Sequence, residues 1–361
     1  MNTEKLIHSI IQRIATGPEL SKNIEEEEAE AAMSAVLNGE VDDVQSAIFL
    51  VALRMKRETM DENTGILKAL VKVTTPQTAK VENLIDIGDP YSGYNRTIPI
   101  SSFLPPLLAE LGLPTVIHGL DSVSPKFGLT HRHINKAMGL DPDISIRDAK
   151  SRIENEDIGW SYIDQSVYCK DLHQLVPLRN KIIKRTVINT LETLIGPLRG
   201  KKTHSVLGYV HKPYPPIYAA LTNSAGFDTS LLIRGVEGGI VPSLRQKGSM
   251  ISYVGGVEKV SAEIDPTMLS INQELRSIAF PGSLNIKSNK TNLAEYAMAL
   301  GMGALSGEKG MYYDGLVYIA SLILWHVNKF DLIEEAATTV RQVLDSGRAI
   351  KDRKASCRER V

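Results

Sequence analysis

The chain has 361 residues, of which 43% are hydrophobic and 23% are charged. These values are typical of a folded globular protein of about two domains, and they exclude a disordered or collagen-like chain. The 41 basic and 42 acidic residues give a net charge of −1, so a nucleic-acid partner would need a local basic patch. The two cysteines, Cys169 and Cys357, suffice neither for a disulfide framework nor for a cysteine-based zinc site.

The N-terminus and the hydropathy pattern give no sign of export or membrane insertion. The first residues include Glu4 and lead into an amphipathic pattern, unlike a secretory signal. No uncharged apolar run approaches the roughly 20 residues that a membrane span requires. We therefore expect a cytoplasmic protein that does not contact a membrane.

The first 75 residues predict a small domain made of helices. Apolar side chains recur at helical spacing over residues 3–73, with turn residues between the periodic stretches. One predicted helix spans about Ile24 to Leu37. Thr59 and Glu62 have the spacing of a capping box that opens the last helix. We expect the helical domain over residues 1–75.

From residue 84 onward, short β-like runs alternate with helical stretches. This alternation predicts an α/β domain with a mainly parallel central sheet. The expected strands are Leu84–Ile87, Thr115–Ile117, Ser205–Tyr209, Ser230–Ile233 and Ser249–Tyr253. Closing helices are expected over residues 292–305 and 314–346, within an α/β domain at 76–350. The basic tail at 351–361 is typical of a solvated chain end.

Two loops follow predicted strands at the sheet edge where α/β folds bind ligands. The first, residues 86–97, has polar groups and precedes a helix N-terminus, a combination that suits an anion. Pro90 lacks an amide donor and tyrosines crowd this loop, so a plain connection remains the alternative. The second loop carries Lys126, a candidate anion ligand, whereas His118 at its start is typical of a structural histidine.

Further basic residues follow these loops. His131 and His133 flank Arg132, and because their side chains point apart we do not expect a metal there. Residues 179–202 contain seven Lys or Arg and one acidic residue, Glu192. The segment is either a solvated helix face or an anion-binding or nucleic-acid surface.

Several of these segments together resemble the anthranilate phosphoribosyltransferases of glycosyltransferase family 3, relatives of the pyrimidine nucleoside phosphorylases. The matching motifs are Leu53-Arg54-Met55-Lys56, His118-Gly119, Ser124 with Lys126 and Gly128, Arg179, Arg185-Thr186, Asn189 and Gly196-Pro197-Leu198. The resemblance covers nearly the whole chain. It implies a helical domain to which about residues 185–200 return, a large α/β domain, a homodimer formed through the helical domains, and a relation to tryptophan biosynthesis.

The same resemblance exposes departures from the family pattern. The family's Gly-Thr-Gly-Gly-Asp loop for phosphoribosyl pyrophosphate corresponds to Asp89-Pro90-Tyr91-Ser92-Gly93. Its Lys-His-Gly-Asn motif corresponds to Ile117-His118-Gly119-Leu120. Its magnesium-binding Asp-Glu pair falls at Ile240-Val241, and neither side chain can bind Mg²⁺. Two other segments, Tyr91-Ser92-Gly93-Tyr94-Asn95-Arg96-Thr97 and Ser124-Pro125-Lys126-Phe127-Gly128-Leu129-Thr130, instead resemble a divergent branch of the family, some of whose members bind nucleic acid.

The resemblance implies a pentosyl transferase with an unidentified acceptor and degraded pyrophosphate and metal motifs. The residues expected to bind its anionic ligand, a phosphorylated sugar or another anion, are Asn95, Arg96, Thr97, Ser101, His118, Gly119, Lys126 and Arg179. No catalytic residue or metal site is assigned, and Mg²⁺ is expected only together with phosphoribosyl pyrophosphate.

Two alternatives remain open at this point. One is a protein that has lost the chemistry and binds single-stranded nucleic acid. Its expected contacts are Arg96, Lys126, Arg132, Arg199, Lys201 and Lys202. The other is a structural or regulatory partner without a small ligand of its own.

Overall fold

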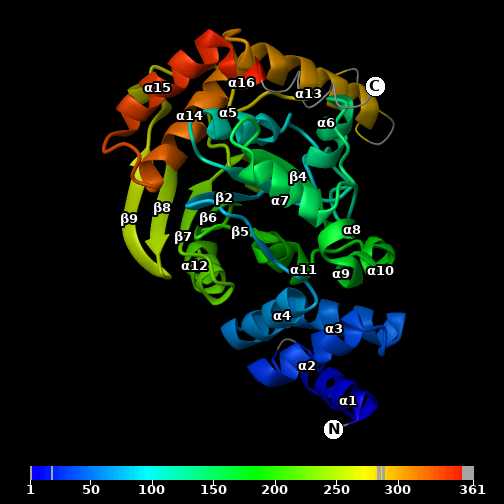
Figure 1. The fold of residues 1–361 in the computed structure, drawn as a ribbon. Coiled ribbons are helices and arrows are strands. Elements are labelled where there is room, and N and C mark those ends of the chain that lie inside the picture. The colour runs from blue at the N-terminus through cyan, green and yellow to red at the C-terminus, as the bar shows by residue number, and fades with distance from the viewer. Residues whose placement is uncertain (1, 18, 283–285, 287–288, 352–361) are drawn as a thin grey trace.

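A computed structural model describes residues 2–17, 19–282, 286 and 289–351. The expected basic tail lies outside the described residues from position 352 onward. The small helical domain is confirmed and lies at the bottom of Figure 1. Its helices are α1 (Thr3–Ile14), α2 (Glu26–Leu37), α3 (Asp43–Lys56) and α4 (Met60–Lys72).

Side-chain caps fix where these helices begin. The Asp42 carboxylate accepts hydrogen bonds from the amides of Val44 and Gln45 at the start of α3. Thr59 and Glu62 form the predicted capping box at the start of α4. Helix α2 begins two residues later than predicted, because the Glu28 carboxylate accepts from the Glu25 amide and makes that residue the cap.

The α/β domain contains a seven-stranded sheet in the order β4-β3-β2-β6-β7-β8-β9. The first five strands in this order are parallel, and β8 and β9 are antiparallel, so the expected mainly parallel sheet is confirmed. The strands are β2 (Asn83–Gly88), β3 (Thr115–Gly119), β4 (Trp160–Asp164), β6 (Lys202–Tyr209), β7 (Thr229–Arg234), β8 (Gly248–Val254) and β9 (Val257–Ile264). The sequence analysis did not predict β4 or β9.

Helices cover both faces of this sheet (Figure 1). The helices that follow the helical domain in the chain are α5 (Leu104–Glu110), α6 (His131–Ala137), α7 (Ile146–Glu154), α8 (Gln165–Tyr168), α9 (Lys170–His173), α10 (Val176–Ile182), α11 (Ile188–Leu191), α12 (Tyr214–Ser224), α13 (Lys290–Leu305), α14 (Met311–His326), α15 (Ile333–Ser346) and α16 (Arg348–Lys351). Short 3-10 turns lie at Ile100–Phe103, Glu192–Leu194, Val236–Gly238 and Pro266–Leu269. None of the helices in the described part of the chain is long and apolar enough to cross a membrane.

The alternation of side chains along the strands builds two hydrophobic cores. In β2, Ile85 and Ile87 join the core that contains the almost wholly buried helix α14. Leu84, pointing the other way, joins the core that also includes α1 to α4. The segment 314–346 holds two helices, α14 and α15, because the chain reverses near Asn328, which has a left-handed φ of 58°.

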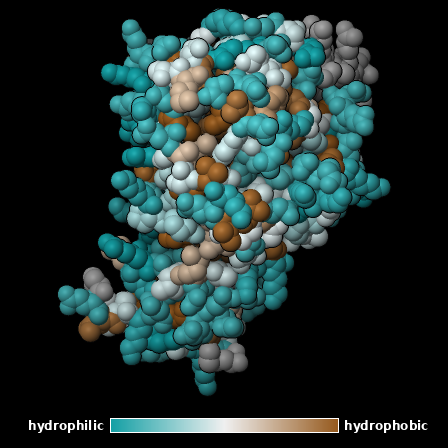
Figure 2. Space-filling model, turned by 90° about the vertical axis from the view of Figure 1, so that its left-hand side faces the viewer, coloured by the Kyte–Doolittle hydropathy of each residue, from teal (hydrophilic) through white to brown (hydrophobic). Residues whose placement is uncertain are grey.

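The segment from α8 to α11 lies beside the helical domain (Figure 1). Helix α10 contacts α3, and α11 contacts α4. Two short strands, β1 (Gln77–Thr78) and β5 (Leu198–Arg199), pair in parallel and join the two parts of the chain. Seen from the side on which β9 lies in Figure 1, the surface is mostly hydrophilic (Figure 2).

Candidate functional site

A cleft of about 1100 Å³ lies beyond the carboxyl ends of β2, β6 and β7. The residues that follow these strands line it, together with Arg54 from α3 and residues 185–193 around α11. Ligands of parallel α/β sheets bind at this edge, outside the carboxyl ends of the strands. The cleft is therefore the candidate functional site.

The walls of the cleft carry a strong excess of positive charge. Its described lining residues include one carboxylate, Glu237, and eight Lys or Arg side chains. The cations are Arg54, Arg96, Lys126, Arg185, Arg234, Arg245, Lys247 and Arg276. Lys247 is partly neutralised by Glu263, 2.8 Å away, and Arg54 lies 3.6 Å from Glu58. Even so, the cleft favours an anionic ligand.

The loop after β2 is filled by its own side chains. Asp89 is fully buried, and its carboxylate accepts hydrogen bonds from the Tyr94 hydroxyl at 2.9 Å and from the Ser101 hydroxyl. The carboxylate also lies 3.1 Å from Nε2 of His131. Burial opposes ionisation, but hydrogen bonds from His131 and Ser101 outweigh it and hold the pKa of Asp89 below its usual value. Asp89 is thus an internal anion of this loop.

Tyr91, in the same loop, also points inward. Its hydroxyl lies within hydrogen-bonding distance of Nδ1 of His118 and of the Tyr168 hydroxyl. On its other side, the His118 ring lies 2.9 Å from the Asp86 carboxylate. Burial raises the pKa of Tyr91 well above its usual value, so its phenol stays protonated. His118 is therefore part of a buried polar chain.

Four of the expected ligand residues come together at the mouth of this loop. The amides of Asn95 and Arg96 and the Thr97 hydroxyl donate to the Glu237 carboxylate at 3.3, 3.1 and 2.9 Å. Lys126 Nζ lies 3.8 Å from the same carboxylate and donates to the Glu237 carbonyl oxygen at 2.8 Å. Arg96, Thr97 and Lys126 line the cleft. These residues form the part of the expected site that the structure assembles.

The other expected ligand residues lie elsewhere. Arg179 donates both terminal nitrogens to Glu192, at 2.8 and 2.7 Å, and the pair is buried. Ser101 donates to Asp89, and Gly119 is the buried last residue of β3. Together with His118, these residues are absent from the lining of the cleft. Internal partners or burial hold these four residues away from the lining of the cleft, and their contact with an anionic ligand stays a prediction.

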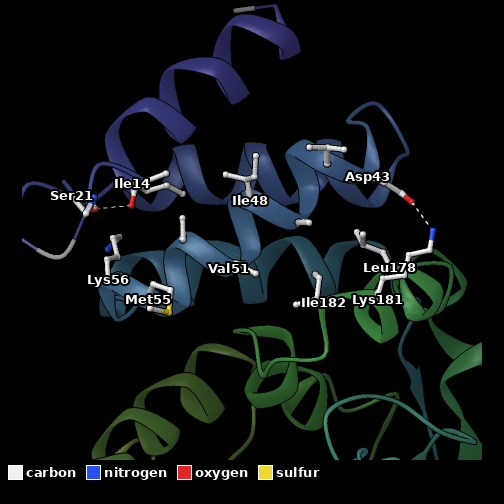
Figure 3. Close-up of a pocket in the computed structure, with 15 residues that line it drawn as sticks. Ile14, Ser21, Asp43, Ile48, Val51, Met55, Lys56, Leu178, Lys181 and Ile182 are labelled. Carbon is white, nitrogen blue, oxygen red and sulfur yellow. Dashed lines mark hydrogen bonds and ion pairs between the residues drawn. The ribbon is translucent and has the colours of Figure 1, made fainter.

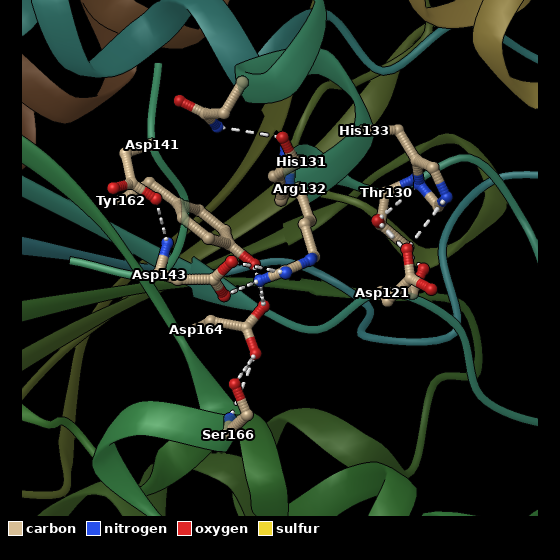
Figure 4. A network of polar contacts seen from close by, with 11 residues as sticks. Asp121, Thr130, His131, Arg132, His133, Asp141, Asp143, Tyr162, Asp164 and Ser166 are labelled. Carbon is tan, nitrogen blue, oxygen red and sulfur yellow. Dashed lines mark hydrogen bonds and ion pairs between the residues drawn. The ribbon is translucent and has the colours of Figure 1, made fainter.

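The expected nucleic-acid residues do not gather in the cleft either. Arg132 donates to both oxygens of Asp143, at 2.6 and 2.9 Å, and lies 3.0 Å from Asp164 (Figure 4). Arg199 is largely buried and donates to two backbone carbonyls, and Lys201 pairs with Glu82 at 3.1 Å. Of the six expected contacts, two line the cleft, namely Arg96 and Lys126.

Several lining residues were not assigned a role from the sequence. Arg54 and Arg185 belong to motifs singled out there, whereas Arg234, Arg245 and Arg276 had no pattern to mark them. The aromatic side chains of the wall were also missed. Rings of His211, Tyr214 and Tyr218 follow one another with centroid separations of 6.2 and 5.9 Å. These aromatic residues line the same cleft as the cations.

The residues at the family's magnesium position do not fit a metal ion. Ile240 and Val241 are both buried and apolar, and magnesium requires hard oxygen ligands. The nearby Ser101 hydroxyl donates to the Asp89 carboxylate. Among the described residues, no group of three or more His, Cys, Asp or Glu side chains could hold a metal ion.

A second cavity, of about 820 Å³, is an apolar groove on the helical domain. Figure 3 shows its floor, formed by one face of α3 with Ile48, Val51 and Met55, and its end at α10. Val44 and Met55 of α3 are 68% and 74% exposed. Such an exposed apolar face is typical of a surface that another protein covers.

Comparison with known families matches the chain in two successive parts. The family model described as "Glycosyl transferase family, helical bundle domain" matches residues 8–73. The model described as "Glycosyl transferase family, a/b domain" matches residues 92–350. Together they span the helical domain and most of the α/β domain.

Individual relatives agree with this match. An uncharacterized protein of Aquifex aeolicus is 28% identical over 323 residues, 89% of this chain and 93% of its own length. The anthranilate phosphoribosyltransferase of Sphingopyxis alaskensis is 27% identical over 343 residues, 94% of this chain and 97% of its own.

Two solved structures share the fold. The crystal structure of anthranilate phosphoribosyltransferase from Thermus thermophilus is 22% identical, with a TM-score of 0.76 over 97% of each chain. The Saccharomyces cerevisiae enzyme in complex with PRPP and Mg is 16% identical, with a TM-score of 0.78 over 97% of this chain and 96% of that one. At these identities, the likeness establishes the architecture.

Proposed function

Since the chain belongs to the glycosyl transferase family that includes anthranilate phosphoribosyltransferases, we propose that it binds a phosphorylated pentose in its cleft and transfers the pentosyl group to an acceptor still to be identified. The observation that carries this proposal is the positive charge of the cleft, whose described lining contains eight Lys or Arg side chains and one carboxylate. Phosphate groups carry the charge that such a wall stabilises. The fold and the cleft position agree with this use.

The same cations suit the chemistry of transfer. When a pentosyl group leaves a phosphate or pyrophosphate, negative charge develops on the departing oxygen, and fixed positive groups lower the barrier. Lys126 and Arg96 flank the loop after β2, and Arg185 and Arg234 face the cleft from other elements. The side chains of Ile240 and Val241 offer no oxygen ligand for a metal ion, so we propose that side-chain cations take the larger share of this stabilisation.

Calorimetric titration with phosphoribosyl pyrophosphate, with and without Mg²⁺, tests the proposal. We expect binding in both conditions, and a small effect of Mg²⁺. No heat at millimolar ligand would contradict the proposed function. Pyrophosphate release in the presence of candidate acceptors, beginning with anthranilate, then tests transfer.

A second candidate, binding of single-stranded nucleic acid, is favoured by the aromatic wall. Proteins that bind single strands combine a basic groove with aromatic side chains on which bases stack. In this cleft, His211, Tyr214 and Tyr218 accompany Arg54 and Arg185. Fluorescence anisotropy with a labelled oligonucleotide across a salt series tests this candidate, and a lack of binding at low salt excludes it.

We also propose that a second copy of the chain covers the apolar groove on the helical domain. The exposed Val44 and Met55, near opposite ends of α3, would both be covered by that contact. Sedimentation of the wild type and of Val44→Asp checks this. We expect the wild type to be a dimer and Val44→Asp to be a monomer. A wild type that is monomeric at micromolar concentration would contradict the proposed dimer.

A further inference from the structure

Glu237 occupies a position that is built for an anion. Two successive backbone amides, those of Asn95 and Arg96, converge on its carboxylate together with the Thr97 hydroxyl. Concave groups of successive N–H donors are anion-binding features of proteins. The Glu237 side chain is 2% exposed, so its carboxylate fills this space. We call the three donors and Lys126 the anion cradle.

The cradle supplies more positive charge than one carboxylate needs. Lys126 Nζ lies 3.8 Å from the carboxylate, and Arg96 Nε lies 4.0 Å from it, with the Arg96 side chain 77% exposed to the cleft. Burial lowers the pKa of Lys126 to about 8, and the charge of Glu237 acts against that decrease. Loss of the carboxylate without a replacement anion would leave a poorly solvated ammonium. A dianion suits the cradle better than Glu237 does.

The backbone that carries Glu237 is held in an unfavourable conformation. Glu237 has a left-handed φ of 56°, a conformation that is unfavourable for a residue with a side chain. Glycines at 235, 238 and 239 surround it, and Gly238 also has a positive φ, of 86°. Such residues change their torsions at low cost. The contacts of the carboxylate therefore hold a strained segment that glycines leave free to rearrange.

We propose that Glu237 is an intramolecular competitor for the anion cradle, which a phosphate group of the ligand must displace in order to bind. The inference rests on the proposed function, because it concerns the same cleft. The displaced carboxylate would move away from Lys126, and the phosphate would accept the hydrogen bonds of Asn95, Arg96 and Thr97. Glu237 thus selects for ligands with at least one doubly charged phosphate group.

Titration with inorganic pyrophosphate tests this competition. Glu237→Gln removes the charge, and Glu237→Gly removes the side chain while suiting the positive φ. We expect both variants to bind pyrophosphate at least tenfold more tightly than the wild type. Glu295→Gln removes one charge on the exposed face of α13, away from the cleft, and should bind as the wild type does. Adding Lys126→Met to Glu237→Gln should abolish the gain.

The outcomes separate the inference from the proposed function. If the wild type binds pyrophosphate and both variants bind no more tightly, the competition is wrong and the proposed function stands. If neither the wild type nor the variants bind, both are wrong. A second test measures amide hydrogen exchange of the wild type alone, so its result does not depend on whether a variant folds. Pyrophosphate should accelerate exchange of the amides at 235–239, and unchanged exchange at saturation would overturn the displacement.

Discussion

The amide of Ile240 donates a 3.0 Å hydrogen bond to the carboxylate of Asp89. The two residues stand at positions where the family pattern is lost, the first glycine of the pyrophosphate loop and the first acid of the magnesium pair. Two of the residues that differ from the family pattern, Asp89 and Ile240, are thus in direct contact. A carboxylate at 240 would lie close to the buried charge of Asp89, and like charges at such a distance are unfavourable.

Replacing Asp89 by glycine, the family residue, should destabilise the protein. The change leaves the hydroxyls of Tyr94 and Ser101 and the Ile240 amide without their acceptor. Unsatisfied buried donors cost about 1–3 kcal/mol each, so we expect a loss of about 3 kcal/mol in the free energy of unfolding. Urea denaturation measures it. Asp143→Ala removes the half-exposed partner of Arg132, and Arg132 keeps Asp164 at 3.0 Å. This change should cost less than about 1 kcal/mol, and a loss equal to that of Asp89→Gly would argue against this account.

Arg179 should prove to be a structural residue. Arg179→Met leaves the Glu192 carboxylate buried without its ion-pair partner, which should cost about 3–5 kcal/mol of stability. The double variant Arg179→Met with Glu192→Met should recover most of that loss, because no buried charge remains. Denaturation of both variants and pyrophosphate titration of the double variant check this. If the double variant folds but no longer binds pyrophosphate, Arg179 contacts the ligand and the prediction is wrong.

Anion binding in the cleft should weaken as pH rises through about 8, because burial lowers the pKa of Lys126 to about 8. Below that pH the ammonium is charged and attracts the anion, and above it the neutral amine does not. Sulfate, whose charge is constant in this range, is a suitable probe for calorimetric titration. Lys126→Met should bind sulfate more weakly at neutral pH and show a flatter pH profile. If Lys126→Met shows the same pH dependence of sulfate binding as the wild type, a group other than Lys126 causes that dependence.

If single-stranded nucleic acid binds in the cleft, its salt dependence should identify the contacts. Each neutralised phosphate contributes about −0.7 to the log–log salt slope. Lys126→Ala and Arg234→Ala should each reduce the magnitude of the slope by about 0.7, since both residues line the cleft. Lys201→Ala is the matched control, because Lys201 pairs with Glu82 away from the cleft and its loss should leave the slope unchanged. Anisotropy at several salt concentrations measures all three.

Local patterns predicted much of the fold. The capping box of Thr59 and Glu62 and the buried strand β2 depend on residues close together in the chain, so the sequence was enough to predict them. Strand β9 was missed because it lies at the sheet edge and is mostly exposed, so it lacks the apolar run that marks a core strand. Strand β4 was missed although it is buried, because its polar residues interrupt the apolar pattern.

The site was harder to predict because its contacts join distant parts of the chain. Glu237 accepts hydrogen bonds from residues about 140 positions earlier, and no local motif announces such a partner. Arg179 is the opposite case. It matched a family motif, yet the buried carboxylate of Glu192 takes its guanidinium. For both Glu237 and Arg179 the sequence shows that the side chain is charged. Which group that charge contacts depends on a residue that is brought near only by the tertiary fold.

The two edge strands of the central sheet, β4 and β9, differ in how far helices cover them. Helices α6, α7 and α8 pack beside β4, whereas β9 ends the sheet on its other side. An uncovered edge strand can pair with the same strand of another molecule. Glu258, Lys259 and Glu263 are exposed along β9 among the valines at 257 and 260. We expect these charges to act as gatekeepers against edge-to-edge aggregation, so that replacing them with apolar residues would lower solubility before it lowered stability.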